Sequence, residues 1–219
     1  MRRDYFANRI EAGERLGAEL VERGGSAGAL VLGLPRGGVP VGYAVARTIG
    51  GELDVMPVRK LGMPGHAELA IGAVAEGGHR VLNERMVESA GLTEEMIAEA
   101  VERAARELAR QAARFRGDRA PVDMSGRRVV LVDDGLATGA SMRAATAAAR
   151  GEGASSVVVG APVASPEAVE LLAREADEVA AVLTPRGFSA VGAWYDDFAQ
   201  VSDDAVVDCL NRARGLSGG

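Results

Sequence analysis

The chain has a single cysteine, few aromatic residues and no excess of positive charge. Because Cys209 has no partner for an internal disulfide, we expect it to be a small core residue on a terminal helix, in a protein of the reducing cytoplasm. The 31 Asp and Glu outnumber the 25 Lys and Arg, no basic cluster is present, and the pI is about 5.1. This charge balance argues against a nucleic acid as partner.

Long apolar runs are also absent. No stretch reaches the length of a membrane span without a charged residue, and the first ten residues lack the apolar segment of a secretory signal. We therefore expect a cytoplasmic protein with no membrane as partner. The 219 residues are enough for one α/β domain with a sizeable core and one excursion from it.

Short runs rich in valine and leucine alternate with helix-favouring segments along most of the chain. The expected buried strands are residues 29–34, 53–58, 129–132, 156–161 and 178–183. Such alternation predicts an α/β fold with a doubly wound, mostly parallel sheet. In a sheet of this kind ligands bind at the carboxyl ends of the strands.

The middle of the chain departs from this alternation. Residues 71–75 and 79–82 predict a hairpin, and residues 93–115 predict the longest helix, with Thr93 as its N-cap. We interpret the charges of this helix as a solvated face. A contact within a homodimer and a lid over the site remain the alternatives.

The most informative stretch is residues 127–141, which read RRVVLVDDGLATGAS. Its β-branched apolar run is typical of a strand buried on both faces, and Asp133 and Asp134 follow at once. The small-residue loop that comes next carries the hydroxyls of Thr138 and Ser141 and leads into an alanine-rich helix. Backbone amides and a helix N-terminus favour a phosphate, whereas carboxylates favour sugar hydroxyls or hydrated Mg²⁺. The stretch therefore predicts a site for a phosphorylated sugar.

Three other kinds of glycine-containing loop are alternatives for residues 133–141. A Walker A loop needs a lysine where Ala140 stands, and the G-x-G-x-x-G fingerprint of dinucleotide sites is missing. An acidic strand end followed by an ordinary glycine turn remains the structural alternative.

The run VVLVDDGLATGAS resembles the phosphoribosyl-diphosphate (PRPP) motif of type I phosphoribosyltransferases. The resemblance implies that Asp133 and Asp134 hold the ribose 2- and 3-hydroxyls and lie near Mg²⁺, chiefly through water. It also implies a loop around the 5-phosphate, formed by Ala137, Thr138, Gly139, Ala140 and Ser141. The hypoxanthine-guanine subgroup has an acid at the position of Ala137, so the motif is more similar to the A-T-G of the adenine subgroup.

A second glycine loop follows the first expected core strand, with the sequence LPRGG. By itself it could be a plain turn between a strand and a helix. The resemblance implies a pyrophosphate site formed by Arg36, Gly37 and Gly38. It also implies that Lys60, the only lysine of the chain, meets the pyrophosphate, although simple solvation is the alternative.

Residues 61–70 contain two glycines and a proline and predict an irregular loop. The resemblance implies a flexible lid that closes over the reacting centre. Within it, Glu68 is the candidate for proton transfer to a nucleobase, with His66 as the other titratable group. A solvated surface loop is the alternative.

Much of the sparse aromatic content gathers in residues 185–198, which usually indicates a packed edge of the core. The resemblance instead implies a hood over the site in which Trp194 or Tyr195 stacks on the base. We expect a single domain, 1–219, with a type I phosphoribosyltransferase core at about 24–184. A helical insertion at about 83–120 and a small C-terminal hood at about 185–219 would complete it.

The resemblance implies a Mg-dependent enzyme that transfers the phosphoribosyl group of PRPP to a small-molecule nitrogen nucleophile and releases pyrophosphate. A nucleobase is the expected nucleophile. The catalytic residues would be Asp133, Asp134, Lys60 and Glu68. A non-catalytic regulator that senses PRPP on the same fold is the second hypothesis, against which the acidic pI and the missing DNA-binding extension count. PRPP synthesis would need an ATP site and a longer chain.

Overall fold

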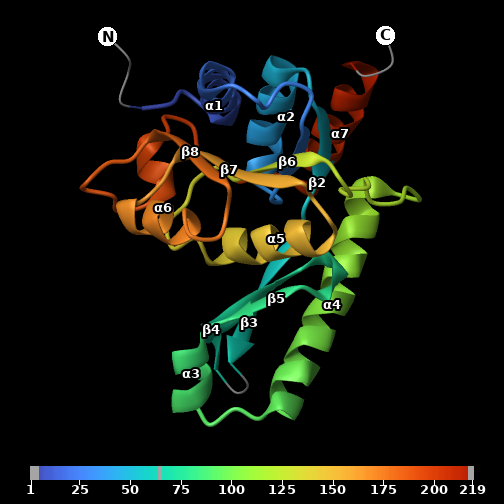
Figure 1. Ribbon diagram of the computed structural model, residues 1–219, viewed down its shortest axis with the longest axis vertical. Helices are drawn as coiled ribbons and strands as arrows, with labels where there is room; N and C mark the ends of the chain where they lie inside the picture. The colour runs from blue at the N-terminus through green and yellow to red at the C-terminus, as the bar shows by residue number, and fades with distance from the viewer. Residues whose placement is uncertain (1–4, 64–65, 217–219) are drawn as a thin grey trace.

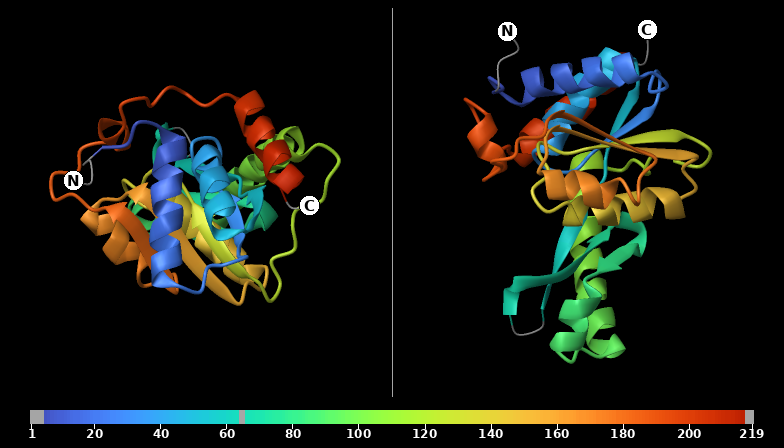
Figure 2. Two further views of the ribbon diagram at one scale, coloured as in Figure 1. Left: turned by 90° about the horizontal axis from the view of Figure 1, so that it is seen from above. Right: turned by 60° about the vertical axis from the view of Figure 1, so that its left-hand side comes forward.

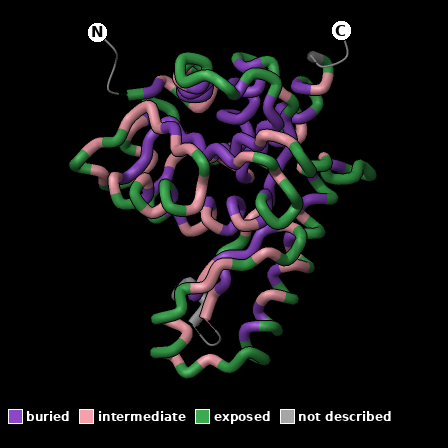
Figure 3. Tube along the Cα trace, viewed as in Figure 1, coloured by how far each residue is buried: buried purple, intermediate pink, exposed green. Residues whose placement is uncertain are grey.

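The computed structural model describes residues 5–63 and 66–216, without the side chains of residues 66–70 and 216. A body formed by a five-stranded sheet between two layers of helices carries an arm that projects from one side (Figure 1). Buried residues gather in the body and thin out toward the tip of the arm (Figure 3).

The five strands of the body are parallel and follow the order β2-β1-β6-β7-β8. Their bounds are β1 (Leu30–Gly33), β2 (Glu52–Val55), β6 (Arg128–Val132), β7 (Ser156–Val163) and β8 (Glu178–Leu183). The prediction of a doubly wound, mostly parallel α/β sheet is thereby confirmed. In the register of β1 and β6, Gly33 lies opposite Val132, so both strands end at the same level. The two predicted ligand loops therefore leave the sheet side by side.

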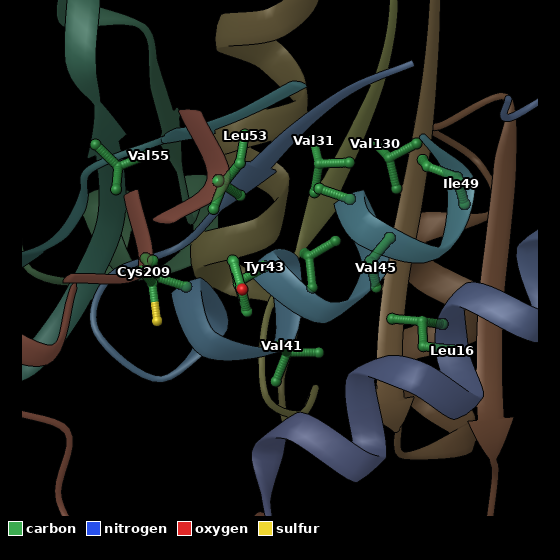
Figure 4. Close-up of a cluster of buried hydrophobic side chains, with 14 of the residues drawn as sticks. Leu16, Val31, Val41, Tyr43, Val45, Ile49, Leu53, Val55, Val130 and Cys209 are labelled. Atoms are coloured by element: carbon green, nitrogen blue, oxygen red, sulfur yellow. The ribbon is translucent and has the colours of Figure 1, made fainter. Parts of the chain in front are cut away.

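Helices cover both faces of this sheet (Figure 2). One face carries α1 (Arg9–Arg23), α2 (Gly38–Ile49) and α7 (Asp203–Leu216), and the other carries α5 (Ala140–Gly151) and α6 (Pro166–Leu172). Alternate strand residues divide between the two cores, since Val31 and Val130 pack against α1 and α2 (Figure 4) while Leu30 and Val129 pack against α5. Cys209 is a buried residue of the first cluster, as predicted.

The arm holds a second sheet of three antiparallel strands, in the order β3-β4-β5, and two helices. Its elements are β3 (Val58–Met63), β4 (His66–Ala75), a 3-10 turn (Glu76–Gly78), β5 (Arg80–Leu82), α3 (Glu84–Ser89) and α4 (Glu94–Arg116). The sheet packs Leu61 and Ile71 against Ala104 and Leu108 of α4. Thr93 caps α4 as predicted, accepting a hydrogen bond from the Met96 amide at 3.3 Å.

Two sequence expectations need correction in the arm. The strand expected at 53–58 is divided between β2 of the main sheet and β3 of the arm, so the excursion begins with β3 and not at residue 83. The irregular loop expected at 61–70 is mostly the β3-β4 hairpin, because the buried side chains of Leu61 and Ile71 give both strands a core against α4. Residues 64 and 65 of the expected lid lie outside the described residues.

A buried ion cluster joins the arm to the main sheet. Arg116, at the end of α4, donates from Nε to both carboxylate oxygens of Asp54 at 3.1 and 2.8 Å. Its Nη1 donates to both oxygens of Glu76 at 2.7 Å, and its Nη2 donates to the Val55 carbonyl at 2.7 Å. The guanidinium thus holds the end of β2, the 3-10 turn and α4 together.

The C-terminal part, expected as a hood at about 185–219, packs in two different places. Residues 185–199, with a 3-10 turn (Val191–Trp194), pack against the N-terminal segment through Phe6, which is fully buried. In contrast, α7 packs against α2 and buries Val206 and Leu210 completely in the main core. None of the helices in the described ranges combines the length and the apolar character needed to cross a membrane.

Candidate active site

The loops after β1 and β6 are in direct contact at the carboxyl ends of these strands. The Leu34 amide donates to the Val132 carbonyl at 2.8 Å, and the Pro35-Arg36 peptide that follows is cis. A Cβ on Gly37 would overlap the Oδ2 oxygen of Asp134, and a Cβ on Gly38 would overlap the Val132 carbonyl oxygen. Glycine is therefore required here because the backbone of one loop lies against the acidic end of the other.

The loop after β6 is anchored from behind by the next strand. The Leu136 amide donates to the Val163 carbonyl at 2.9 Å, and the Ser165 hydroxyl donates to the Ala137 carbonyl at 2.7 Å. The loop then enters α5, which begins at Ala140. These contacts hold the residues between the acidic pair and the helix in one place.

A cavity of about 160 Å³ lies in front of this loop. All five residues expected around the 5-phosphate line it, together with Asp133 and Lys60. Lys60 comes from β3 of the arm, where it lies opposite Ala73 of β4. The structure therefore brings together residues from two different sheets that the sequence linked only through a resemblance.

Arg36 is the one expected pyrophosphate ligand that points elsewhere. Its Nη1 lies 3.6 Å from Oδ1 of Asp203, at the start of α7, and its side chain is 37% exposed. Asp203 also pairs with Arg114 of α4 at 2.8 Å. Gly37 and Gly38 lie against the acidic pair, and Lys60 lines the cavity. To bind pyrophosphate beside these residues, the Arg36 side chain would have to leave Asp203.

The two carboxylates of the motif have different surroundings. Asp134 Oδ2 accepts a hydrogen bond from Nε of Arg9 at 2.8 Å and forms an ion pair with its Nη2 at 2.8 Å. Asp133 Oδ1 accepts the Asp134 amide at 2.8 Å. Burial, and then the charge of Asp134, raise the pKa of Asp133 well above its usual range. Burial also raises the pKa of Asp134, although Arg9 opposes this shift. The site therefore concentrates negative charge that one arginine only partly balances.

Arg9 was not foreseen from the sequence. The stripe of apolar residues after it indicates only an amphipathic helix, and no local motif marks an arginine in the first turn as part of a site. Its place becomes visible only when α1 is packed on the main sheet.

Comparison with known proteins decides which family has this arrangement. The family model described as a phosphoribosyl transferase domain matches residues 4–180. The chain belongs to the phosphoribosyltransferase family. Proteins from two strains of Mycobacterium tuberculosis, provisionally named phosphoribosyl transferases, are 47% identical to this chain over 209 residues. That alignment covers 95% of this chain and 47% of each relative, so the chain spans about half the length of the curated relatives it matches.

A solved structure shares the fold over nearly the whole chain. A protein of Thermus thermophilus is 46% identical and superimposes with a TM-score of 0.83, covering 95% of this chain and 98% of the other. The body and the arm therefore occur together in a second protein.

The aromatic residues expected to stack on a base pack against other side chains of the protein. Tyr195 is 7% exposed, its ring packs on Phe6 and Phe198 with centroids 5.3 and 4.9 Å away, and its hydroxyl donates to the Asp134 carbonyl at 2.6 Å. Burial raises the pKa of Tyr195 far above its usual value, so the hydroxyl stays a donor. Trp194 stacks on Tyr5 at 5.7 Å. This arrangement leaves Tyr195 little surface for a base, and stacking by Trp194 stays a prediction.

The proton-transfer candidate Glu68 lies on β4, as does His66. The side chains of both residues lie outside the described part of the chain. The role of Glu68 therefore stays a prediction.

Proposed function

We propose that this protein transfers the 5-phosphoribosyl group of PRPP to a nitrogen nucleophile, with a nucleobase as the candidate, and releases pyrophosphate. The observation that carries the proposal is that Lys60, Asp133 and residues 137–141 line one cavity. An ammonium group, a carboxylate and a phosphate-type loop on one cavity suit a ligand with sugar hydroxyls between two phosphate groups. PRPP has this order of groups.

Each part of PRPP then has a chemically suited neighbour. The amides of residues 137–141 and the N-terminus of α5 would bind the 5-phosphate, and Asp133 would accept hydrogen bonds from the ribose. The pyrophosphate would lie toward Lys60 and the amide of Gly37, next to the acidic pair. The Gly38 amide already donates to the Leu34 carbonyl at 2.9 Å, so Gly38 would contribute close approach of the backbone rather than a donor.

The acidic pair also fits Mg²⁺. In the part of the chain that the structure describes, no three acidic, histidine or cysteine side chains gather around a metal position. Two carboxylates are nevertheless enough, because Mg²⁺ keeps several waters and takes substrate oxygens. Burial, and then the charge of Asp134, raise the pKa of Asp133, and the negative charge of this pair favours a cation. Asp133 and Asp134 would hold it, chiefly through water. When bound, Mg²⁺ neutralises charge on the pyrophosphate.

The reaction is a displacement at the anomeric carbon of the ribose. The bond from this carbon to the pyrophosphate oxygen breaks, its electron pair leaves with pyrophosphate, and the nitrogen nucleophile bonds to the carbon. The ammonium group of Lys60 would stabilise the charge that develops on the leaving group. The proton lost by the nitrogen passes to a base, for which Glu68 is the candidate. The rest of the site positions the two reactants.

The test is pyrophosphate release from PRPP and Mg²⁺ in the presence of purine, pyrimidine and pyridine bases, with calorimetric PRPP binding measured in parallel. Release that depends on one base would support the transferase and identify its acceptor. PRPP binding without release would instead support the sensing regulator. If PRPP does not bind at all, the proposal is wrong.

A further inference from the structure

Arg9 lies at the point where three separated segments of the chain meet. Its Nε and Nη2 both lie 2.8 Å from Oδ2 of Asp134, and its Nη1 donates to the Ala199 carbonyl at 2.8 Å. The guanidinium carbon lies 3.9 Å from the centroid of the Phe198 ring, in the geometry of a cation–π contact. The Arg9 side chain is only 11% exposed, because protein groups contact the edges of its guanidinium and one of its faces.

The fold places this arginine through α1. Asn8 caps the helix by accepting hydrogen bonds from the amides of Ile10 and Glu11, so Arg9 is the first helical residue. One turn later a Cβ on Gly13 would overlap the Val41 carbonyl oxygen and the Ala44 side chain. Glycine thus lets α1 lie close against α2, whose N-terminus adjoins the acidic pair.

Asp134 is held by two segments that are distant in the sequence, whereas the Asp133 carboxylate accepts a hydrogen bond from the adjacent Asp134 amide. The Arg9 guanidinium binds the Asp134 carboxylate, and the Tyr195 hydroxyl donates to the Asp134 backbone carbonyl at 2.6 Å. One oxygen of Asp134 is therefore committed to the protein. Asp133, by contrast, lines the cavity in front of the phosphate-type loop. The two neighbouring carboxylates have different tasks in this arrangement.

We propose that Arg9 is a positioning residue for the PRPP site: it binds Asp134, fixes the direction of the acidic pair and leaves Asp133 as the carboxylate that faces the ligand. This inference rests on the proposed function. Without Arg9, two adjacent carboxylates would repel each other and also the phosphate groups of the ligand, and Asp134 would be free to turn into the cavity. The role is indirect, since Arg9 acts through Asp134.

The experiment is calorimetric binding of PRPP in Mg²⁺ to the full chain and to Arg9→Gln, with thermal unfolding of each protein recorded alongside. Because a charge-assisted contact is lost next to the ligand, we expect Arg9→Gln to weaken PRPP binding by about tenfold to a hundredfold. Arg9→Lys retains the charge but loses the paired donors, so we expect an intermediate affinity. A purely structural role would lower the unfolding temperature and leave the affinity of the folded protein unchanged.

Arg15→Gln is the matched control. Arg15 lies on the same helix, its guanidinium lies 4.5 Å from the centroid of the Phe6 ring, and its Nη1 donates to the Tyr5 carbonyl at 3.2 Å. It has the same kinds of contact as Arg9 without touching the acidic pair, so PRPP affinity should not change.

The outcomes separate the two proposals. If the unmodified protein does not bind PRPP, the proposed function itself fails. If it binds PRPP and Arg9→Gln binds equally well, the function stands and the role of Arg9 is refuted. Should Arg9→Gln not fold, Arg9→Lys decides: weakened binding supports the role, and unchanged affinity overturns it.

Discussion

Two clusters in this protein each contain two carboxylates and one arginine, but they use them differently. At the root of the arm, Arg116 donates to both Asp54 and Glu76. At the ends of β1 and β6, Arg9 binds Asp134 alone, and the pKa of Asp133 is raised by burial and by Asp134. Both clusters have one cation for two carboxylates, but in the first the guanidinium binds both carboxylates, whereas in the second Asp133 is left for a ligand or a cation. The pairing, and not the residue types, separates a structural cluster from a candidate site.

The largest expected effect comes from breaking the cluster around Arg116. Arg116 is 5% exposed and Asp54 3%, so Arg116→Met would leave a buried carboxylate without its cationic partner. We expect a loss of about 3–5 kcal/mol in the free energy of unfolding, measured by urea denaturation at neutral pH. Arg106→Ala is the control, because it breaks an exposed pair with Glu102 and should cost less than about 1 kcal/mol. Equal losses in the two variants would show that Arg116 does not hold the arm.

The second prediction concerns the cluster around Arg9. The double variant Asp133→Asn, Asp134→Asn removes the charges that would face the ribose and Mg²⁺, and we expect PRPP affinity in Mg²⁺ to fall by about a hundredfold or more. Calorimetry measures the change. Asp118→Asn, at an exposed aspartate in the loop after α4, should leave the affinity unchanged. Unchanged affinity in the double variant would refute the assignment of the site.

The third prediction separates two neighbouring cations on β3. Lys60 lines the cavity, whereas Arg59 pairs with Glu107 of α4. We expect Lys60→Ala to weaken PRPP binding by about tenfold, because it removes a charge-assisted contact to the pyrophosphate. Arg59→Ala should have little effect on the same titration. If both variants bind equally well, the arm contributes no ligand to the site.

The smallest effect is a gain in stability that sharpens the contrast between the clusters. The pKa of the Asp133 carboxyl is higher in the folded than in the unfolded chain, so the folded chain binds the carboxyl proton more tightly. The stability of the fold therefore falls as the pH rises from the unfolded-state pKa to the folded-state pKa. Asp133→Asn removes this penalty and can still accept the Asp134 amide. We expect a higher unfolding temperature than that of the unmodified protein at neutral pH.

The gain should shrink as the pH is lowered, since Asp133 then becomes protonated in the unmodified protein as well. Thermal unfolding of both proteins from neutral to acidic pH, without ligand, measures the difference. A difference that grows on acidification would contradict the direction of the pKa shift.

Local patterns predicted the elements well where each one finds its partners nearby in the sequence. The apolar run after Arg127 forms β6, and Thr93 and Ser165 cap α4 and α6 through amides three residues ahead. The hairpin around Gly77 also forms, as β4 and β5. The loop expected ahead of this hairpin, at residues 61–70, forms strands instead. Its apolar residues are buried against α4, which begins more than twenty residues later in the chain.

The sequence by itself determined the order of strand, acidic pair, small-residue loop and helix in residues 127–141, since these are set by neighbours along the chain. Only the tertiary structure decided which residues meet this motif. Arg9 lies 125 positions before Asp134 and reaches it through the packing of α1 on α2, and Lys60 reaches the loop from a second sheet. Contacts of this kind depend on the relative placement of whole elements, which leaves no periodic or local signal in the amino-acid sequence.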